Sequence, residues 1–377
     1  MSDLDHETQI LASIKTKFPP CCLQLNASAS IILVGTYDLV KETGRRYGTI
    51  ERYSLTSSSE TSIKIELMEE VLNVDDYNDK RMSAILDLKI IRQFESDDMI
   101  SFVTCHSTGC LNFWVYDNAQ DKIIHKNNIQ VTEDESVLLT SLQIKNTNQD
   151  STVLQIACTA TDGSAALVTI NNGNGDERIE FMEDQHQLEC WTAEFGDGGC
   201  FENCFFTGGD DATIKLFDYR AGLNSAVWSN SRIHDAGVVS LKTNAFDSKG
   251  LNGKTYHSGN ENSLLSGSYD DTIQLNDLRM MGSQLYPGSI RPANKDSKNL
   301  GGGVWRLIDT EESDELLVCC MYNGAKIVKV DYDSDEVFIE KNYVKQGHNS
   351  MCYGGDYRNK TAATCSFYDN SLQVWKK

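Results

Sequence analysis

The sequence predicts an all-β fold made of repeated strand units, and three observations carry this prediction. Proline occurs only 4 times, whereas Gly (27), Ser and Asp recur in short clusters. Between the clusters lie runs of about five residues rich in Val, Ile, Leu, Phe and Thr, a pattern typical of many short strands. One strand–turn–strand segment also returns along the chain, as in repeat architectures. With 377 residues, of which 40% are hydrophobic, the chain has ample apolar material for a buried core.

Seven copies of this segment can be traced in order along the chain. Each has an apolar strand, a small residue, a tight turn that often carries Asp, and a second alternating strand. The copies are VGTYDLV (34–40), TCHSTGCLNFW (104–114), TATDGSAALV (159–168), FTGGDDATIKLFDYR (206–220), LSGSYDDTIQLNDLR (265–279), CCMYNGAKIVKV (319–330) and TCSFYDNSLQVWKK (364–377). Most copies have a further apolar strand upstream, at 84–90, 190–195, 237–243 and 303–309.

These units resemble WD repeats, and the resemblance covers nearly the whole chain. In that family each unit is a four-stranded blade of ~40–45 residues, and the blades are arranged radially. Trp114 and Trp375 stand at the signature Trp position, whereas the other units carry different residues there. We therefore expect residues 18–377 to form a single seven-bladed WD-repeat β-propeller.

Two structures are open for the N-terminal arm, residues 1–17. The last unit stops at Trp375-Lys376-Lys377, after its third strand. Segment 8–14 alternates enough to supply the missing outermost strand, and this pairing would close the ring and remove an open sheet edge. Alternatively, residues 4–17 form a short amphipathic helix on the surface.

The charge balance excludes several classes of partner. The chain has 34 Lys+Arg against 55 Asp+Glu, a formal net charge of −21, which is unsuited to binding nucleic acid or anionic membrane surfaces.

The sequence also bears on the cellular location of the chain. No run approaches the ~18 apolar residues of a membrane-spanning helix, so we expect no membrane insertion. The acidic start, MSDLDHETQ, does not resemble a secretory signal. We expect a cytoplasmic monomer whose 12 cysteines are reduced.

The repeated turn places the same residue types at the same points of each unit. Aspartates recur in the turn itself, and such side chains bond their own turn and can reach a nearby His. We expect His234 with Asp270 and His348 with Asp369 to be structural pairs within their blades. The residue before the turn Asp should face the rim around the ring's centre, and these seven positions are Tyr37, Ser107, Thr161, Asp210, Tyr269, Tyr322 and Tyr368. The tyrosines either pack between blades or form a binding face of rigid aromatic groups.

Common enzyme motifs are missing from the chain. There is no G-x-S-x-G, H-E-x-x-H or paired C-x-x-C sequence. Cys200 and Cys204 are four residues apart without a second ligand pair nearby, so we expect neither a metal nor another cofactor. Motifs alone would indicate an interaction propeller without enzymatic activity.

Several segments go beyond the general WD pattern. They are 18–23, 186–195, 232–240, LGGGVWR (300–306), 319–326, 347–356 and 365–375. Together they are similar to the diphthine methyl ester methylesterase family, also named diphthine methyltransferase, in its fungal form. The resemblance runs from about residue 18 to the end of the chain. It implies a carboxylic ester hydrolase that removes a methyl ester from methylated diphthine on translation elongation factor 2, before the final amidation.

The implied chemistry suggests which residues act on the ester. Ester hydrolysis needs a general base and donors for the developing oxyanion. His234 is the first candidate base, oriented by Asp235 or Asp270, and His348 and Glu189 are alternatives. The glycines 301–303 offer backbone N–H groups to a carbonyl. Ser350 and Cys352 are candidate nucleophiles, although direct attack by water is simpler.

The implied substrate also carries a quaternary ammonium group, which calls for an aromatic and partly acidic pocket. The residues expected to contact the substrate are Trp191, Trp305, Arg306, Tyr269, Tyr322 and Tyr368. Packing between blades is the alternative role for the two tryptophans. The alternative function for the whole chain is a non-enzymatic adaptor, because WD propellers commonly present their faces to other proteins.

Overall fold

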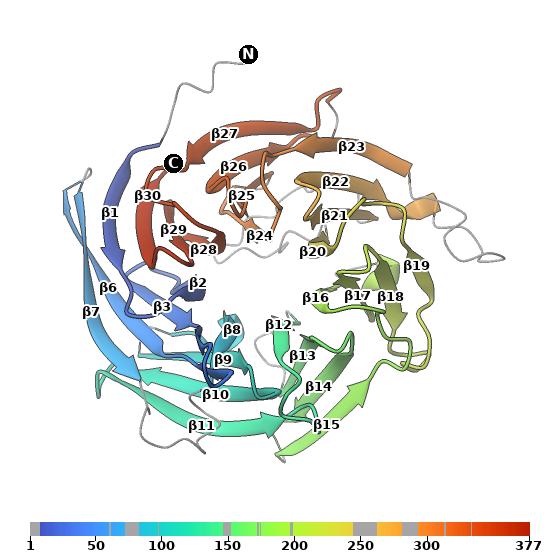
Figure 1. Ribbon diagram of the computed structural model, residues 1–377, viewed down its shortest axis with the longest axis horizontal. Coiled ribbons are helices and arrows are strands. Elements are labelled where there is room, and N and C mark those ends of the chain that lie inside the picture. The colour runs from blue at the N-terminus through green and yellow to red at the C-terminus, as the bar shows by residue number, and fades with distance from the viewer. Residues whose placement is uncertain are drawn as a thin grey trace.

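Seven antiparallel four-stranded sheets form the protein, arranged as blades in a ring (Figure 1). The computed structural model describes residues 8–59, 62–71, 83–96, 98–145, 152–171, 173, 175–196, 199–243, 262–280, 293–312, 314–332 and 334–377. Within these ranges helical structure is limited to short 3-10 turns. No helix in them is long and apolar enough to cross a membrane. The prediction of a seven-bladed WD-repeat β-propeller is confirmed.

The blades are numbered in chain order, and their strands are given from the centre of the ring outward. Blade 1 holds β2 (Pro20–Leu25), β3 (Ile31–Thr36), β6 (Ile50–Ser59) and β7 (Ser62–Val71), and blade 2 holds β8 (Ile85–Ile90), β9 (Met99–His106), β10 (Cys110–Asp117) and β11 (Lys122–Gln130). Blade 3 holds β12 (Leu139–Ile144), β13 (Val153–Ala160), β14 (Ala165–Asn171) and β15 (Asp176–Phe181), and blade 4 holds β16 (Cys190–Phe195), β17 (Cys204–Gly209), β18 (Ile214–Asp218) and β19 (Trp228–Asn230). Blade 5 holds β20 (Val238–Thr243), β21 (Ser263–Ser268), β22 (Thr272–Asp277) and β23 (Ala293–Asn299), and blade 6 holds β24 (Arg306–Asp309), β25 (Glu315–Cys319), β26 (Ala325–Val330) and β27 (Phe338–Val344). Blade 7 holds β28 (Cys352–Arg358), β29 (Thr361–Ser366), β30 (Ser371–Lys376) and β1 (Ile10–Lys15).

The ring closes through β1, which pairs antiparallel with β30 in a register that sets Ile10 opposite Trp375 and Lys15 opposite Ser371. Leu11 and other apolar side chains of β1 pack against the core shared by blades 7 and 1. The N-terminal segment is therefore a strand here, not a surface helix. Residues 1–7 of the arm lie outside the described residues.

The hydrophobic core lies between neighbouring blades. Leu33 of blade 1 packs with Ile85 and Phe102 of blade 2, and Leu317 of blade 6 packs with Trp375 of blade 7. The second strands of the blades are covered on both faces, so β17 and β25, for example, are buried along their whole length. All 12 cysteines are free thiols, and most of them are buried.

Hydrogen bonds inside the blades follow the WD pattern. In blade 2, Trp114 Nε1 donates to Thr104 Oγ1 at 2.9 Å, and this hydroxyl lies 2.7 Å from His106 Nε2. In blade 7, Trp375 Nε1 donates to Thr364 Oγ1 at 3.1 Å. Each network ties the third strand of its blade to the second.

Blade 1 departs from the repeat pattern at its turn. Its third strand does not follow Asp38 directly, because a hairpin of β4 (Asp38–Val40) and β5 (Arg45–Tyr47) is inserted before β6. The Tyr47 ring meets Phe18 edge-on, with the ring centres 5.2 Å apart. Arg46 Nε donates to the Tyr37 hydroxyl at 3.0 Å. These contacts hold the hairpin against the body of the propeller.

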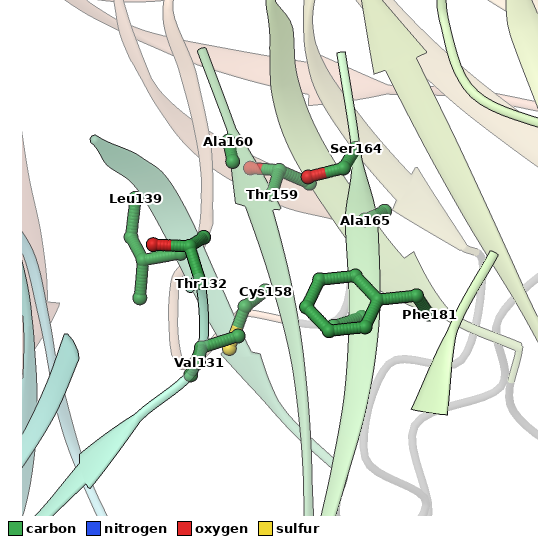
Figure 2. Close-up of a pocket in the computed structure, with 10 residues that line it drawn as sticks. Val131, Thr132, Leu139, Cys158, Thr159, Ala160, Ser164, Ala165 and Phe181 are labelled. Atoms are coloured by element: carbon green, nitrogen blue, oxygen red, sulfur yellow. The ribbon is translucent and has the colours of Figure 1, made fainter. Parts of the chain in front are cut away.

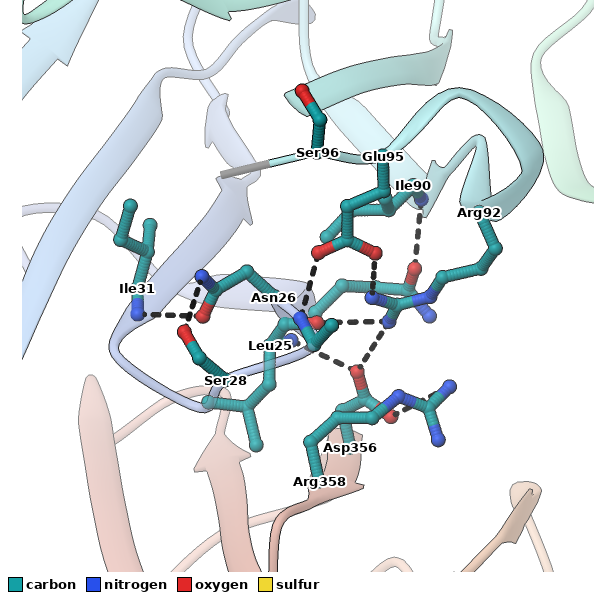
Figure 3. A network of polar contacts seen from close by, with 12 residues as sticks. Leu25, Asn26, Ser28, Ile31, Ile90, Arg92, Glu95, Ser96, Asp356 and Arg358 are labelled. Carbon is teal, nitrogen blue, oxygen red and sulfur yellow. Dashed lines mark hydrogen bonds and ion pairs between the residues drawn. The ribbon is translucent and has the colours of Figure 1, made fainter. Parts of the chain in front are cut away.

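A polar network joins three blades beside the closure (Figure 3). Asp356, at the end of β28, accepts hydrogen bonds at Oδ2 from the Leu25 N–H at 2.8 Å and from Arg92 Nη2 at 3.2 Å. Arg92 Nη2 also donates to the Leu25 carbonyl at 2.8 Å, while Nη1 binds Glu95. Blades 7, 1 and 2 are thus linked by one buried carboxylate and one guanidinium.

Candidate functional site

A β-bulge recurs near the start of the innermost strands. In six blades the pairing between the innermost and second strands skips one residue of the innermost strand. The skipped residues are Cys21, Leu86, Thr140, Trp191, Val239 and Tyr353. In blade 6 the corresponding residue is Trp305, whose N–H donates to the Cys319 carbonyl just before Arg306 pairs with Cys319. Bulges re-aim side chains and are common beside active sites. In this ring three of the seven bulge residues are aromatic.

These three aromatic residues meet, although they come from different blades. The ring centres of Trp191 and Trp305 are 5.8 Å apart, and those of Trp305 and Tyr353 are 4.8 Å apart. Tyr269, in the turn between the second and third strands of blade 5, lies 5.9 Å from Trp305. Phe367 of blade 7 follows at 5.4 Å from Tyr353. We call these five residues the aromatic cluster.

The convergence of the cluster locates it in the molecule. Trp191 belongs to blade 4 and Trp305 to blade 6, with blade 5 between them, so their rings can touch only near the centre of the ring. The contributing segments are starts of innermost strands and turns between second and third strands, which lie at the same end of every blade. The cluster therefore lies on one face of the propeller, beside its axis.

Two acidic side chains border the cluster. Trp191 Nε1 donates to Asp210 Oδ1 at 3.3 Å. Burial raises the pKa of Tyr269, and the nearby charges of Asp210 and Glu189 raise it further. Both carboxylates are thus close to the aromatic rings. An aromatic surface with an acidic edge favours an organic cation.

Tyr322 and Tyr368 lie at the outer side of the cluster and are 60% and 71% exposed. The Tyr368 ring meets Phe367 edge-on at 4.9 Å. Tyr322 has no ring contact in the described part of the chain, but its charge would raise the pKa of Tyr269 and of Tyr353. Both tyrosines are accessible to a large partner.

Arg306 is directed below the cluster into an ion pair. Its Nη1 lies 3.1 Å from Asp87 Oδ2 in blade 2. Burial alone would raise the pKa of Asp87, but Arg306, Lys89 and two backbone N–H groups outweigh it and hold the pKa below its usual value. The pairing favours a structural role for Arg306 over the substrate contact expected from the sequence.

His234 is enclosed within blade 5. Its Nδ1 is hydrogen-bonded to Asp270 Oδ2 at 3.0 Å and its Nε2 to Ser266 Oγ at 2.8 Å, and its side chain is fully buried. Both ring nitrogens are engaged, so neither is left to activate a water molecule. These contacts favour the structural pairing with Asp270 over the role of a general base. The Asp235 side chain is exposed, and only its backbone N–H binds Asp270.

His348 is similarly enclosed within blade 7. Its Nε2 lies 2.8 Å from Thr364 Oγ1, and burial lowers its pKa to about 4. The expected pair with Asp369 is incomplete, because Nδ1 of His348 has no hydrogen-bond partner in the described residues and Asp369 Oδ2 accepts the Asn349 N–H instead. Of the four candidate catalytic residues, the half-buried Glu189 is the one beside the cluster.

The candidate nucleophiles are poorly placed. Cys352 is fully buried, and a hydrogen bond with Cys319 together with burial raises its pKa well above the usual value. Ser350 Oγ accepts the Tyr368 N–H at 3.1 Å. Gly301, one of the glycines expected to offer an N–H to the substrate carbonyl, already donates that N–H to Asn299 Oδ1 at 2.8 Å. Attack by water remains the simplest chemistry.

The described part of the chain contains a small hollow but no group of side chains that could hold a metal ion. Among the described ranges no group of three or more His, Cys, Asp or Glu could hold a metal ion. A small hollow with an empty volume of about 140 Å³ lies between blades 2 and 3 (Figure 2). Its lining, including Leu139, Ala160 and Phe181, carries no carboxylate, imidazole or basic group. The hollow therefore has no acidic or basic group that could take part in ester hydrolysis. It is also separate from the aromatic cluster, which is formed by blades 4–7.

Sequence reasoning missed Tyr353 and Phe367. A signal for Tyr353 was present, because Cys352-Tyr353 repeats the pattern of Cys190-Trp191, a buried residue followed by an aromatic residue where an innermost strand begins. The hydrogen bond at 2.9 Å between His186 Nδ1 and Asp211 Oδ1 in blade 4 was also missed.

Known proteins resemble this chain in sequence and in fold. No family model matches the chain. It is 38% identical over 416 residues to the diphthine methyltransferase of Saccharomyces cerevisiae, covering 99% of both chains. It is 28% identical to the diphthine methyltransferase of Schizosaccharomyces pombe, covering 94% of this chain and 93% of that one.

A diphthine methyltransferase homolog of Dictyostelium discoideum is 26% identical over 82% of this chain and 79% of that protein. A chain in the crystal structure of the mitotic checkpoint complex has a TM-score of 0.64 over 100% of this chain and 95% of that chain, at 11% identity. This likeness supports the fold alone. The similarity to the yeast protein, which extends over nearly the whole of both chains, shows that this chain belongs to the diphthine methyltransferase family.

Proposed function

We propose that this protein is a carboxyl methylesterase of diphthamide biosynthesis. It hydrolyses the methyl ester of methylated diphthine on translation elongation factor 2, in the cytoplasm, and so frees the carboxylate for amidation. Membership of the diphthine methyltransferase family supports a role in this pathway. The observation that carries the rest of the proposal is the aromatic cluster with its acidic edge.

The cluster suits a substrate that bears a quaternary ammonium group. The ring centres of Trp191, Tyr269 and Tyr353 lie 5.8, 5.9 and 4.8 Å from that of Trp305, so several aromatic rings are gathered around one tryptophan. A cation over an aromatic face gains roughly 0.5–2 kcal/mol. Asp210 and Glu189 add negative charge at the edge, and the exposed Tyr322 and Tyr368 offer contact area to the folded protein that carries the modified histidine.

Glu189 is the general base in this proposal. It is half-buried, it precedes the bulge residue Trp191 by two positions, and its carboxylate lies close enough to Tyr269 to raise the pKa of that phenol. A carboxylate beside the bound ammonium group can accept a proton from the attacking water. Positioned general bases contribute on the order of 10²–10⁴ in rate.

The test uses purified protein and elongation factor 2 that carries the methyl-esterified intermediate. Mass spectrometry should record loss of the ester methyl group with the wild-type protein. Glu189→Gln should lower kcat by about 10²–10⁴ without changing the melting temperature. Glu202→Gln is the matched control, because Glu202 lies in the segment before β17, where its backbone carbonyl binds Lys145, and it should retain full activity. An intact ester after incubation with the folded wild-type protein would disprove the esterase proposal.

A non-enzymatic adaptor is the second candidate function. The exposed fractions of Tyr322 and Tyr368 favour it, because exposed aromatic side chains are typical anchors in protein interfaces. An adaptor should bind elongation factor 2 with or without the ester and leave the ester intact. The same mass-spectrometric assay, combined with a binding measurement, separates the two functions.

A further inference from the structure

The indole N–H of Trp305 is a buried donor without an acceptor. Its Nε1 is shielded from solvent and has no hydrogen-bond partner in the described part of the chain. Three of the other four tryptophans are paired, since Trp191 donates to Asp210, Trp114 to Thr104 and Trp375 to Thr364. Buried polar groups in folded proteins are nearly always satisfied, so an exception calls for an explanation.

The position of Trp305 suggests the explanation. Its ring contacts three of the other four members of the aromatic cluster, Trp191, Tyr269 and Tyr353, which is more than any other member does. It follows a backbone segment that passes unusually close to its neighbours, because a Cβ on Gly303 would come within 2.6 Å of Met321 Sδ. The chain therefore delivers an unpaired donor to the middle of the site.

The neighbouring Tyr269 carries a second donor. The hydroxyl of Tyr269 has no hydrogen-bond partner among the residues described, and its ring is a neighbour of the Trp305 ring at 5.9 Å. Burial and the charges of Asp210 and Glu189 keep this phenol protonated, so it remains a donor at neutral pH. By contrast, the Tyr353 hydroxyl already donates to Met351 Sδ.

We propose that Trp305 Nε1 and the Tyr269 hydroxyl form a subsite for a ligand oxygen, next to the rings that hold a quaternary ammonium group. The ligand class is a betaine-like group, with a trimethylammonium and a carbonyl or carboxylate oxygen on one short side chain. This inference rests on the proposed function. It assigns Trp305 Nε1 and the Tyr269 hydroxyl as hydrogen-bond donors to the carbonyl oxygen of the substrate's ester. Donors at this position stabilise the negative charge that develops on the oxygen when water attacks.

The chemistry of tryptophan fits both parts of such a ligand. Indole has a donor and no acceptor, so it binds oxygen without ambiguity. Its ring face can hold the cation at the same time. Trp305→Phe removes the donor and keeps an aromatic ring. Trp228→Phe is the control, because Trp228 lies in β19, the outermost strand of blade 4, away from the aromatic cluster.

A binding experiment tests the subsite without elongation factor 2. Protein labelled with ¹⁵N in its 5 tryptophans is titrated with betaine and, separately, with tetramethylammonium, and the indole signals are followed by NMR. Betaine should move the Trp305 indole proton downfield, as a new hydrogen bond requires, whereas tetramethylammonium should not. The signals of Trp114 and Trp375 should stay in place. A Trp305 proton that does not move downfield with betaine, or moves equally with tetramethylammonium, overturns the proposal.

The kinetic experiment uses the esterase assay. Trp305→Phe should lower kcat by about 10²-fold, as loss of an oxyanion donor does, with KM changed less than about threefold. Trp228→Phe should retain the wild-type kcat. Equal kcat values for the two variants would contradict the subsite. A wild-type protein without turnover would refute the esterase function, while the betaine titration still decides whether the oxygen subsite exists.

Discussion

Arg306 in blade 6 and Asp87 in blade 2 form an ion pair across the centre of the ring, with Nη1 and Oδ2 3.1 Å apart. The Asp87 side chain is only 2% exposed, and it also accepts N–H groups from Leu88 and from Leu142 in blade 3. One carboxylate therefore connects innermost strands of blades 2, 3 and 6. The pair fixes the innermost strands beneath the aromatic cluster.

Asp87→Asn should lower the free energy of unfolding strongly, because it leaves the largely buried side chain of Arg306 without its counter-charge. Breaking a buried pair from one side costs about 3–5 kcal/mol. Urea unfolding should record this loss. The control is Asp218→Asn, which breaks a pair with the largely exposed Arg220 and should change stability little. A loss for Asp87→Asn no larger than that of the control would contradict the structural role of the pair.

His234→Ala should destabilise the protein and leave the chemistry of folded molecules unchanged. The substitution removes one hydrogen bond to Asp270 and one to Ser266, and such bonds contribute about 0.5–3 kcal/mol each, with the larger values for charged partners such as Asp270. The melting temperature and the kcat per folded molecule should be measured on the same preparation. A normal melting temperature combined with lost turnover would instead make His234 the base.

Tyr353→Ala should raise KM about tenfold and change kcat much less. The variant removes the ring that lies 4.8 Å from Trp305, and a cation–aromatic contact is worth roughly 0.5–2 kcal/mol. Tyr219→Ala is the control, since that ring contacts Lys145 away from the cluster. If both variants give the wild-type KM, the aromatic cluster is not the ammonium site.

The sequence predicted the fold more completely than the site. The seven turns are local patterns, so each blade could be recognised independently. Trp191, Tyr269 and Trp305 were also expected together, because they occupy repeat positions near the ring's centre. Tyr353 was missed because the bulge that re-aims it is a property of strand pairing, which the turn pattern does not record.

Long-range partners were beyond the reach of local patterns. Arg306 and Asp87 are 219 residues apart, and they meet only because ring closure sets blade 6 across from blade 2. The hydrogen bonds that occupy both nitrogens of His234 likewise depend on packed geometry. Residue type alone therefore favoured a catalytic histidine, whereas the folded structure leaves a carboxylate, Glu189, beside the cluster.

Stability should decrease as the pH falls from about 6.5 towards 4. Burial lowers the pKa of His106 to about 3 and that of His348 to about 4. Between these values and about 6.5 the unfolded chain binds protons that the folded protein does not. The contribution of each neutral histidine to the free energy of unfolding is therefore complete above pH 6.5. Below that pH, each histidine lowers the free energy of unfolding by about 1.4 kcal/mol per pH unit until its folded-state pKa is reached.

Urea unfolding at several pH values between 7 and about 4.5 checks this expectation. His348→Gln keeps a polar side chain of similar size and removes one titrating group. The slope of the unfolding free energy against pH should therefore fall by about 1.4 kcal/mol per pH unit. An unchanged slope in that variant would show that His348 is already protonated in the folded protein.

The closure of blade 7 by β1 has a consequence for biosynthesis. The strand that leaves the ribosome first among those described must find β30, which leaves it last. Because ribosomes add about 5–20 residues per second, β1 waits on the order of tens of seconds with its backbone unpaired. The nascent chain can stack blades in sequence, but the ring closes only after β30 has been made. Cellular factors that shield exposed strands during this interval should therefore influence how much protein reaches its working form.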